Sequence, residues 1–190
     1  MCANPCAAGG VAARNHGPAW QARDRQGVRD WSRCKCARHA CVYLPDLDEM
    51  FLAERGGGAT LNGRSIHCSS ATDVSKALVA TGFSYTPAHR TVQSRRVTEF
   101  IHQIRDVRRM GAAAVDICFV ACGRLDAYFE ENLHAWDIAA AEVIAREAGA
   151  RAGDFAGGPL RPEETLIAAS GVFDALSALL IAAQRKHPHG

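Results

Sequence analysis

The sequence has few features of a membrane protein or of a nucleic-acid-binding protein. No uncharged stretch approaches the roughly 20 residues that a helix needs to cross a bilayer. Residues 1–11 contain no lysine or arginine, so they lack the basic start of a secretory signal. The formal net charge is only +2, which argues against a strongly basic nucleic-acid-binding surface. We therefore expect a cytoplasmic protein with neither a membrane nor a nucleic acid as its partner.

Common catalytic motifs are also absent. The sequence has no GxxxxGK[ST] loop, no GxGxxG after a strand, no GxSxG and no HExxH. His67-Cys68 resembles the start of a cysteine-phosphatase loop, but Val74 stands where that loop requires an arginine. Residues 56–58 are three successive glycines, a pattern more typical of a hairpin turn than of a phosphate cradle.

Residues 1–41 differ from the rest of the chain. They hold seven basic and two acidic residues, and they contain no leucine, isoleucine or phenylalanine. Such a segment buries too little apolar surface to offset its ordering entropy. We therefore expect an unrelated, disordered tail at 1–41 and a folded part at 42–190.

The tail is rich in cysteine and arginine, and a small zinc or nucleic-acid module is the alternative to a tail with loose thiols. The spacings do not match the usual CxxC pairs, so loose thiols are favoured. The candidate ligands are Cys2, Cys6, Cys34, Cys36, His39 and Cys41.

The folded part has the periodicities of a mixed α/β protein. The sequence predicts a hairpin over 42–53, a tight turn at Asn62-Gly63 and a final helix over 171–186. Further strands are predicted at 77–83, 124–130 and 166–169, and further helices at 93–110, 112–122 and 137–148. In the helix at 93–110, Arg96 is expected on the polar side, opposite an apolar stripe. Cys118 and Cys122, four residues apart, are expected to pack in the core.

The segment from Glu130 to Gly149 is the strongest local candidate for a functional site. Glu130 ends a predicted strand, and Trp136 and Asp137 follow at the start of a predicted helix. A carboxylate at that position is favoured by the helix dipole, so Asp137 is either an N-terminal cap or a metal ligand beside free backbone N–H groups.

Four sequence blocks resemble the inositol monophosphatase family of magnesium-dependent phosphatases. They lie in the family's order across about 42–186, so together they are more specific than any one of them. The blocks are VYLPDLDEMFLAERGGGATLNG (42–63), ATGF (80–83), RRMGAAAVDICFVACGRLDAYFE (108–130) and WDIAAAEVIAREAGA (136–150).

The resemblance implies an α/β fold, a layered αβαβα sandwich that is partial here and lacks the family's N-terminal helices and first strands. It implies hydrolysis of a phosphate monoester of a small polyol or sugar, with Mg²⁺ as cofactor and a homodimer as a candidate assembly. By the same resemblance, Asp137 is a metal ligand, Glu130 contacts substrate hydroxyls, and the backbone at Gly111 and Ala113 lines the substrate pocket.

The family's upstream metal-binding motifs do not occur in residues 1–41. No glutamate precedes Glu49, and neither Asp24 nor Asp30 lies in an Asp-Pro-x-Asp-Gly-Thr motif. We therefore expect phosphatase activity to be impaired or absent. The alternatives are a related phosphatase acting on histidinol phosphate, fructose bisphosphate or a nucleotide bisphosphate, and a non-catalytic interaction or oligomerisation module.

Overall fold

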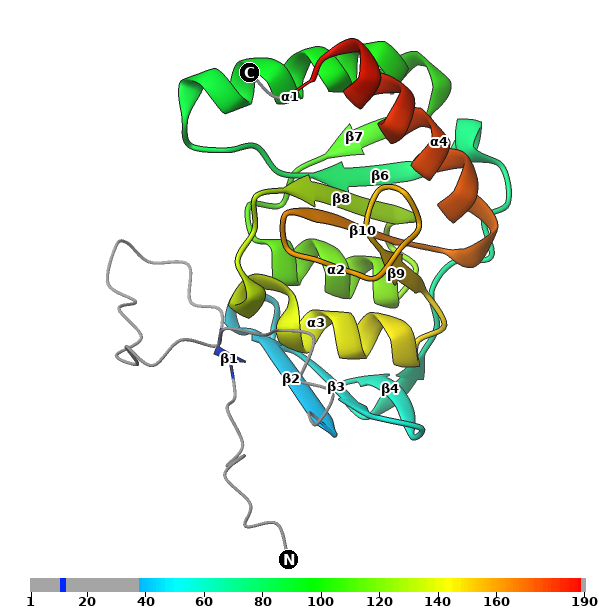
Figure 1. The fold of residues 1–190 in the computed structure, drawn as a ribbon. Helices are drawn as coiled ribbons and strands as arrows, with labels where there is room; N and C mark the ends of the chain where they lie inside the picture. The colour runs from blue at the N-terminus through cyan, green and yellow to red at the C-terminus, as the bar shows by residue number, and fades with distance from the viewer. Residues whose placement is uncertain (1–10, 13–37, 189–190) are drawn as a thin grey trace, which may run out of the picture.

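The computed structural model describes residues 11–12 and 38–188, which form alternating layers of helices and sheets (Figure 1). Helices α1 (Pro87–Phe100) and α4 (Ser170–Lys186) pack on one face of a first sheet. Helices α2 (Ala113–Ala121) and α3 (Ala135–Glu147) separate this sheet from a second one. The predicted α/β fold is confirmed, with four layers in the described residues.

The outer sheet, called sheet A, follows the order of the chain, β1-β2-β3-β4-β5. Its strands are β1 (Val11–Ala12), β2 (His39–Leu44), β3 (Glu49–Glu54), β4 (Gly58–Leu61) and β5 (Arg64–Ile66). Strands β2 to β5 pair antiparallel, which confirms the predicted hairpins. Asn62 and Gly63 both have positive φ, 49° and 78°, as a two-residue type I′ turn requires.

The inner sheet, called sheet B, has the order β7-β6-β8-β10-β9, so chain neighbours are not sheet neighbours. Its strands are β6 (Leu78–Thr81), β7 (Asp106–Arg108), β8 (Ala127–Glu131), β9 (Arg151–Gly153) and β10 (Glu164–Ala168). Strands β6 and β8 pair in parallel, with Thr81 beside Phe129. This pairing places the residues after β6 next to the end of β8.

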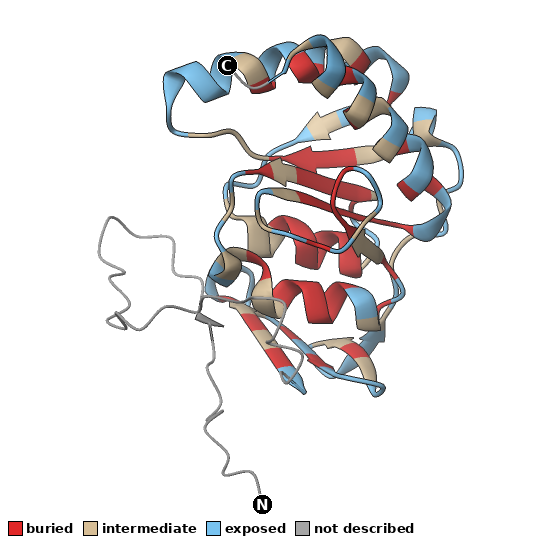
Figure 2. Ribbon diagram, in the orientation of Figure 1, coloured by how far each residue is buried: buried red, intermediate tan, exposed pale blue. Residues whose placement is uncertain are grey.

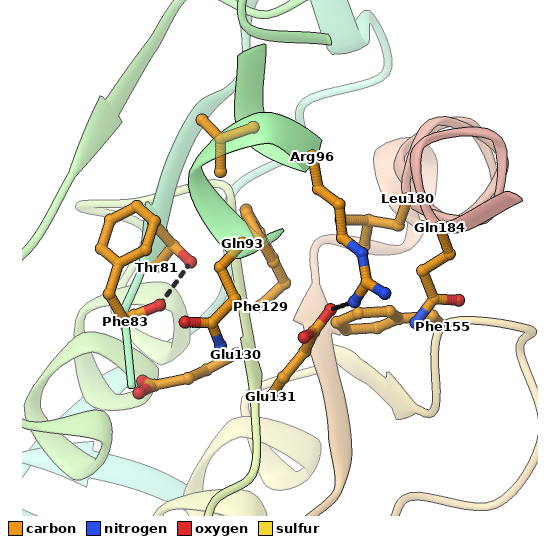
Figure 3. Close-up of a pocket in the computed structure, with 12 residues that line it drawn as sticks. Thr81, Phe83, Gln93, Arg96, Phe129, Glu130, Glu131, Phe155, Leu180 and Gln184 are labelled. Carbon is orange, nitrogen blue, oxygen red and sulfur yellow. Dashed lines mark hydrogen bonds and ion pairs between the residues drawn. The ribbon is translucent and has the colours of Figure 1, made fainter. Parts of the chain in front are cut away.

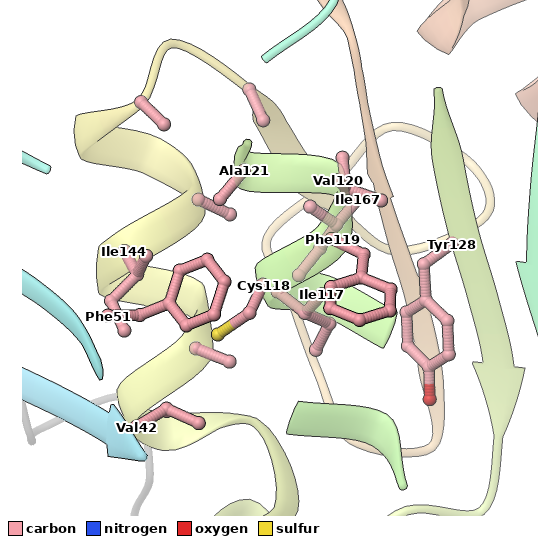
Figure 4. Packing of buried hydrophobic residues seen from close by; sticks show 14 of the residues in the cluster. Val42, Phe51, Ile117, Cys118, Phe119, Val120, Ala121, Tyr128, Ile144 and Ile167 are labelled. Carbon is pink, nitrogen blue, oxygen red and sulfur yellow. The ribbon is translucent and has the colours of Figure 1, made fainter. Parts of the chain in front are cut away.

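Two apolar clusters hold the layers together (Figure 2). One lies around α2 and α3 between the sheets, where the Cys118 sulfur points toward the Phe51 ring (Figure 4). The prediction that Cys118 packs in the core is confirmed. The other lies between sheet B and the α1–α4 pair. There the rings of Phe100 and Phe129 pack edge to face, with their centroids 5.6 Å apart. No helix of the described residues is long and apolar enough to span a membrane.

The three-glycine segment is a hairpin turn between β3 and β4, as the sequence favoured. Gly56 and Gly58 have φ of 75° and 83°, which a side chain would disfavour. Their amides donate to the two carboxylate oxygens of Glu147, at 3.0 and 3.1 Å. The backbone donors that a phosphate would use are therefore engaged by the end of α3.

The prediction of a helix over 93–110 is wrong at both ends, because α1 spans Pro87–Phe100. Pro87 occupies the first turn of α1, where its fixed φ and missing N–H are tolerated. The helix ends at Phe100, a 3₁₀ turn η4 (Ile101–Gln103) follows, and Asp106–Arg108 form edge strand β7. Ile101 is 45% exposed whereas Ile104 is buried, so the apolar residues past Phe100 do not follow the spacing of a continuous helix. Strands β7 and β9, each of three residues, were not predicted.

Arg96 also departs from the prediction, because it is buried rather than on the polar side of the helix. Its guanidinium pairs with Glu131 across the interface between α1 and β8, with side chains only 5% and 7% exposed. The other elements are confirmed to within a few residues. The predicted tail at 1–41 lies mostly outside the described residues, and β2 begins at His39.

Candidate functional site

The sequence-predicted site residues gather where β8 ends and where α2 and α3 begin. Glu130 is the fourth residue of β8, and Asp137 lies in the first turn of α3 after a short connection. Ala113 is the first residue of α2, and Gly111, with φ of 100°, precedes it. The structure thus brings two carboxylates to the helix-start edge of the inner layer.

Glu130 and Tyr128 share one face of β8. The Tyr128 hydroxyl donates to Glu130 Oε2 at 2.5 Å. Burial is the main reason that the pKa of Glu130 is raised, and the nearby charge of Asp137 raises it further. The Tyr128 hydrogen bond and Arg109 oppose this shift. Glu130, near the end of β8, and Asp137, in the first turn of α3, are thus two carboxylates at neighbouring ends of their elements.

Asp116 is a buried acid that the sequence analysis did not identify. It lies in the first turn of α2, and its Oδ1 accepts from the backbone N–H of Met110 at 3.3 Å. Burial raises the pKa of Asp116 to about 7, with a smaller contribution from Glu130. The hydrogen bond from Met110 fixes the backbone that leads into Gly111. In the sequence, only the position of Asp116 in the RRMGAAAVDICFVACGRLDAYFE block (108–130) could have pointed to this residue.

Asp137 acts as a cap at the start of α3. Its Oδ2 accepts from the backbone N–H of His134 at 2.8 Å, so the capping interpretation is confirmed. Beside it, Trp136 is 68% exposed and stacks on His134 with centroids 4.4 Å apart. A carboxylate has two oxygens, so this bond is compatible with metal ligation through the other one.

The described residues contain no group of three or more His, Cys, Asp or Glu side chains that could hold a metal ion. Magnesium usually binds one or two carboxylates and completes its shell with water and substrate phosphate. The Asp137 carboxylate therefore suits one ligand position of such a coordination shell. The described residues do not supply a complete set of ligands.

The other chemical candidates receive no support. His39 and Cys41 lie on β2, and the remaining zinc candidates fall outside the described residues. Burial raises the pKa of the Cys68 thiol, which is the opposite of what a nucleophilic cysteine needs.

Comparison with known proteins decides the family. A sequence model described as the inositol monophosphatase family matches residues 37–189. This chain belongs to the inositol monophosphatase family. The resemblance seen in the four sequence blocks is thereby confirmed.

Individual relatives agree with this membership. The chain is 43% identical over 120 residues to the Nus factor SuhB of Vibrio cholerae, covering 63% of this chain and 45% of the relative. It is 37% identical over 148 residues to the inositol monophosphatase of Dictyostelium discoideum, covering 75% and 54%. The chain thus spans about half the length of these relatives.

Solved structures of the family show the same arrangement of elements. The inositol monophosphatase of Anabaena (Nostoc) sp. PCC 7120 superposes with a TM-score of 0.71 at 34% identity, over 76% of this chain and 59% of that one. The extragenic suppressor protein suhB of Bartonella henselae gives 0.70 at 33% identity, over 75% and 55%. The layered fold of this chain therefore corresponds to part of the family fold.

Proposed function

We propose that this chain forms the substrate-binding wall of a magnesium-dependent phosphatase site for a small phosphorylated polyol or sugar. The supporting observation is the position of Glu130 near the end of β8 and of Asp137 in the first turn of α3, at the edge where α2 and α3 begin. A polyol phosphate carries hydroxyls and a dianionic group, and this edge offers both acceptors and helix N–H donors.

The proposed roles follow from the chemistry of each group. The Glu130 carboxylate accepts hydrogen bonds from substrate hydroxyls, and the backbone at Gly111 and Ala113 lines the pocket. Asp137 holds Mg²⁺ through a carboxylate oxygen. When bound, this ion would polarise the phosphate and favour attack by water.

We propose further that hydrolysis by this chain is weak or absent. When no substrate phosphate is bound, a single carboxylate leaves a hydrated Mg²⁺ ion weakly held. Residues 1–41 contain no glutamate, and Asp24 and Asp30 lie outside any Asp-Pro-x-Asp-Gly-Thr motif. Asp137 is the one described residue to which the family resemblance gives a ligand role.

The test is phosphate release from inositol monophosphate with and without Mg²⁺, together with calorimetric titration of Mg²⁺. Asp137→Asn should weaken Mg²⁺ binding, whereas Asp46→Asn, in the exposed turn after β2, should not change it. Unchanged Mg²⁺ affinity in Asp137→Asn would refute the ligand role. Fast turnover that depends on Asp137 would refute the proposed impairment. Histidinol phosphate, fructose bisphosphate and a nucleotide bisphosphate in the same assay distinguish the related phosphatases.

A second candidate function is a non-catalytic interaction module, including a homodimer. It is favoured by the outer face of sheet A, where Met50 and Leu52 of β3 are exposed, and by Leu47, which is exposed in the turn before that strand. The relative from Vibrio cholerae is named a Nus factor and not a phosphatase. Self-association of the folded protein in sedimentation velocity, without Mg²⁺-dependent turnover, would favour this candidate. A monomer that hydrolyses phosphate esters would exclude it.

A further inference from the structure

The Glu130 carboxylate lies directly against Gly82, the residue that follows β6. Strands β6 and β8 run parallel with Thr81 beside Phe129, so the next residues of each strand are neighbours. A Cβ atom built on Gly82 would overlap all three atoms of the Glu130 carboxylate group. In Figure 3, Glu130 and Glu131 leave β8 on opposite sides, and only Glu131 points toward Arg96.

The backbone at Gly82 does not itself require glycine. Gly82 is not among the glycines with positive φ, so an alanine could adopt its conformation. What excludes a side chain at this position is therefore the carboxylate of Glu130. This is unlike Gly56 and Gly58, where the backbone conformation is the reason for glycine.

Tyr128 holds the carboxylate from the other side. Its ring is fully buried, so the position of its hydroxyl is fixed by the core, and this hydroxyl donates to Glu130 Oε2. The carboxylate is therefore enclosed between the Tyr128 hydroxyl, which donates to it, and the backbone of Gly82, which has no side chain. A methyl group at Gly82 would take the space that the Glu130 carboxylate occupies and displace the carboxylate.

We propose that Gly82 is a positioning residue that holds the Glu130 carboxylate where it can accept hydrogen bonds from substrate hydroxyls, and so favours polyol phosphates over phosphate alone. This inference rests on the proposed substrate role of Glu130. The atoms that the new methyl group would meet are at the tip of the flexible Glu130 side chain. Gly82→Ala should therefore move this carboxylate with little change in the free energy of unfolding.

The experiment measures binding of inositol monophosphate and of inorganic phosphate by calorimetry in the presence of Mg²⁺. Loss of a hydrogen bond to a charged group is worth about tenfold in affinity. Gly82→Ala should therefore weaken inositol monophosphate binding about tenfold and leave phosphate binding unchanged. Gly57→Ala, which adds a methyl group in the exposed β3–β4 turn, is the matched control and should change neither.

A double-mutant cycle shows whether Gly82 acts through Glu130. In the Glu130→Ala background no carboxylate remains to be displaced, so adding Gly82→Ala should cause no further loss. An equal loss from Gly82→Ala in both backgrounds would overturn the positioning role. So would an unchanged affinity in Gly82→Ala when Glu130→Ala weakens binding.

A ligand-independent measurement separates this inference from the proposed function. The pH titration of the Glu130 side-chain carboxyl by ¹³C NMR should change in Gly82→Ala and not in Gly57→Ala. If Glu130→Ala leaves inositol monophosphate binding unchanged, or if neither ligand binds, the proposed function falls. The carboxyl titration then decides whether Gly82 positions Glu130, and an unchanged titration would overturn that as well.

Discussion

The buried pair of Arg96 and Glu131 gives the sharpest prediction about stability. Arg96 Nη1 lies 2.5 Å from Glu131 Oε1, with side chains 5% and 7% exposed. Arg96 Nε also donates to the backbone oxygen of His187 at 2.8 Å, which ties α1 to the end of α4. Its Nη2 is the one buried side-chain nitrogen or oxygen of the described residues without a hydrogen-bond partner. The guanidinium thus depends on Glu131 for its charge compensation.

Glu131→Gln would leave the buried guanidinium without its counter-ion. Breaking a buried ion pair in this way costs about 3–5 kcal/mol, whereas replacing both partners by apolar side chains is often neutral. We therefore expect Glu131→Gln to lower the free energy of unfolding by about 3–5 kcal/mol. The double variant Arg96→Met/Glu131→Met should recover most of that loss.

The assay is urea unfolding followed by circular dichroism. The control is Asp174→Asn, which breaks the exposed Arg151–Asp174 pair, with side chains 42% and 80% exposed. Exposed pairs contribute about 0–1 kcal/mol, so this control should change little. The reasoning would be refuted if Glu131→Gln cost no more than Asp174→Asn. It would also be refuted if the double variant were less stable than Glu131→Gln.

Two further predictions concern α3 and α2. Glu147→Ala removes both hydrogen bonds to the β3–β4 turn and should cost only about 1 kcal/mol, because the site is at most half-buried and a negative charge is unfavourable at a helix C-terminus. The loss in free energy of unfolding is measured by urea unfolding, with Glu163→Ala at an exposed position as the control. Equal losses in the two variants would contradict this prediction. For Asp116, the folded-state pKa is raised from 3.8 to about 7, so its protonated form is favoured on folding and stability falls as pH rises across that range. Asp116→Asn should therefore gain stability relative to the wild type between pH 4 and pH 8, by at most about 4 kcal/mol. A difference independent of pH would contradict this prediction.

Much of the fold could be predicted because its signals are local. Asn62-Gly63 specifies a tight turn by its backbone preferences, and Gly123 and Gly149, which have positive φ, follow the ends of α2 and α3. Strands β7 and β9 were missed because three residues carry too little pattern, and their identity comes from pairing with β6 and β10.

The site was only partly predictable for a related reason. The local pattern drew attention to Glu130 and Asp137, but only the family resemblance gave them roles at a site. The position of Asp137 at a helix start is also typical of a cap, which the structure contains. Arg96 and Asp116 are charged residues whose burial depends on partners 35 and 6 residues away. Periodicity assigns such residues to a polar face, because it carries no information about distant counter-charges and donors.

The position of β10 has a consequence for synthesis of the chain on the ribosome. This strand lies between β8 and β9 in sheet B, yet it is translated after both of them. Until β10 emerges, β8 ends the sheet as an open edge and β9 has no strand with which to pair. Between the synthesis of Asp137 in α3 and that of β10, the nascent chain therefore carries the candidate site beside an unpaired, aggregation-prone edge. Assembly of sheet B waits until β10 has been made.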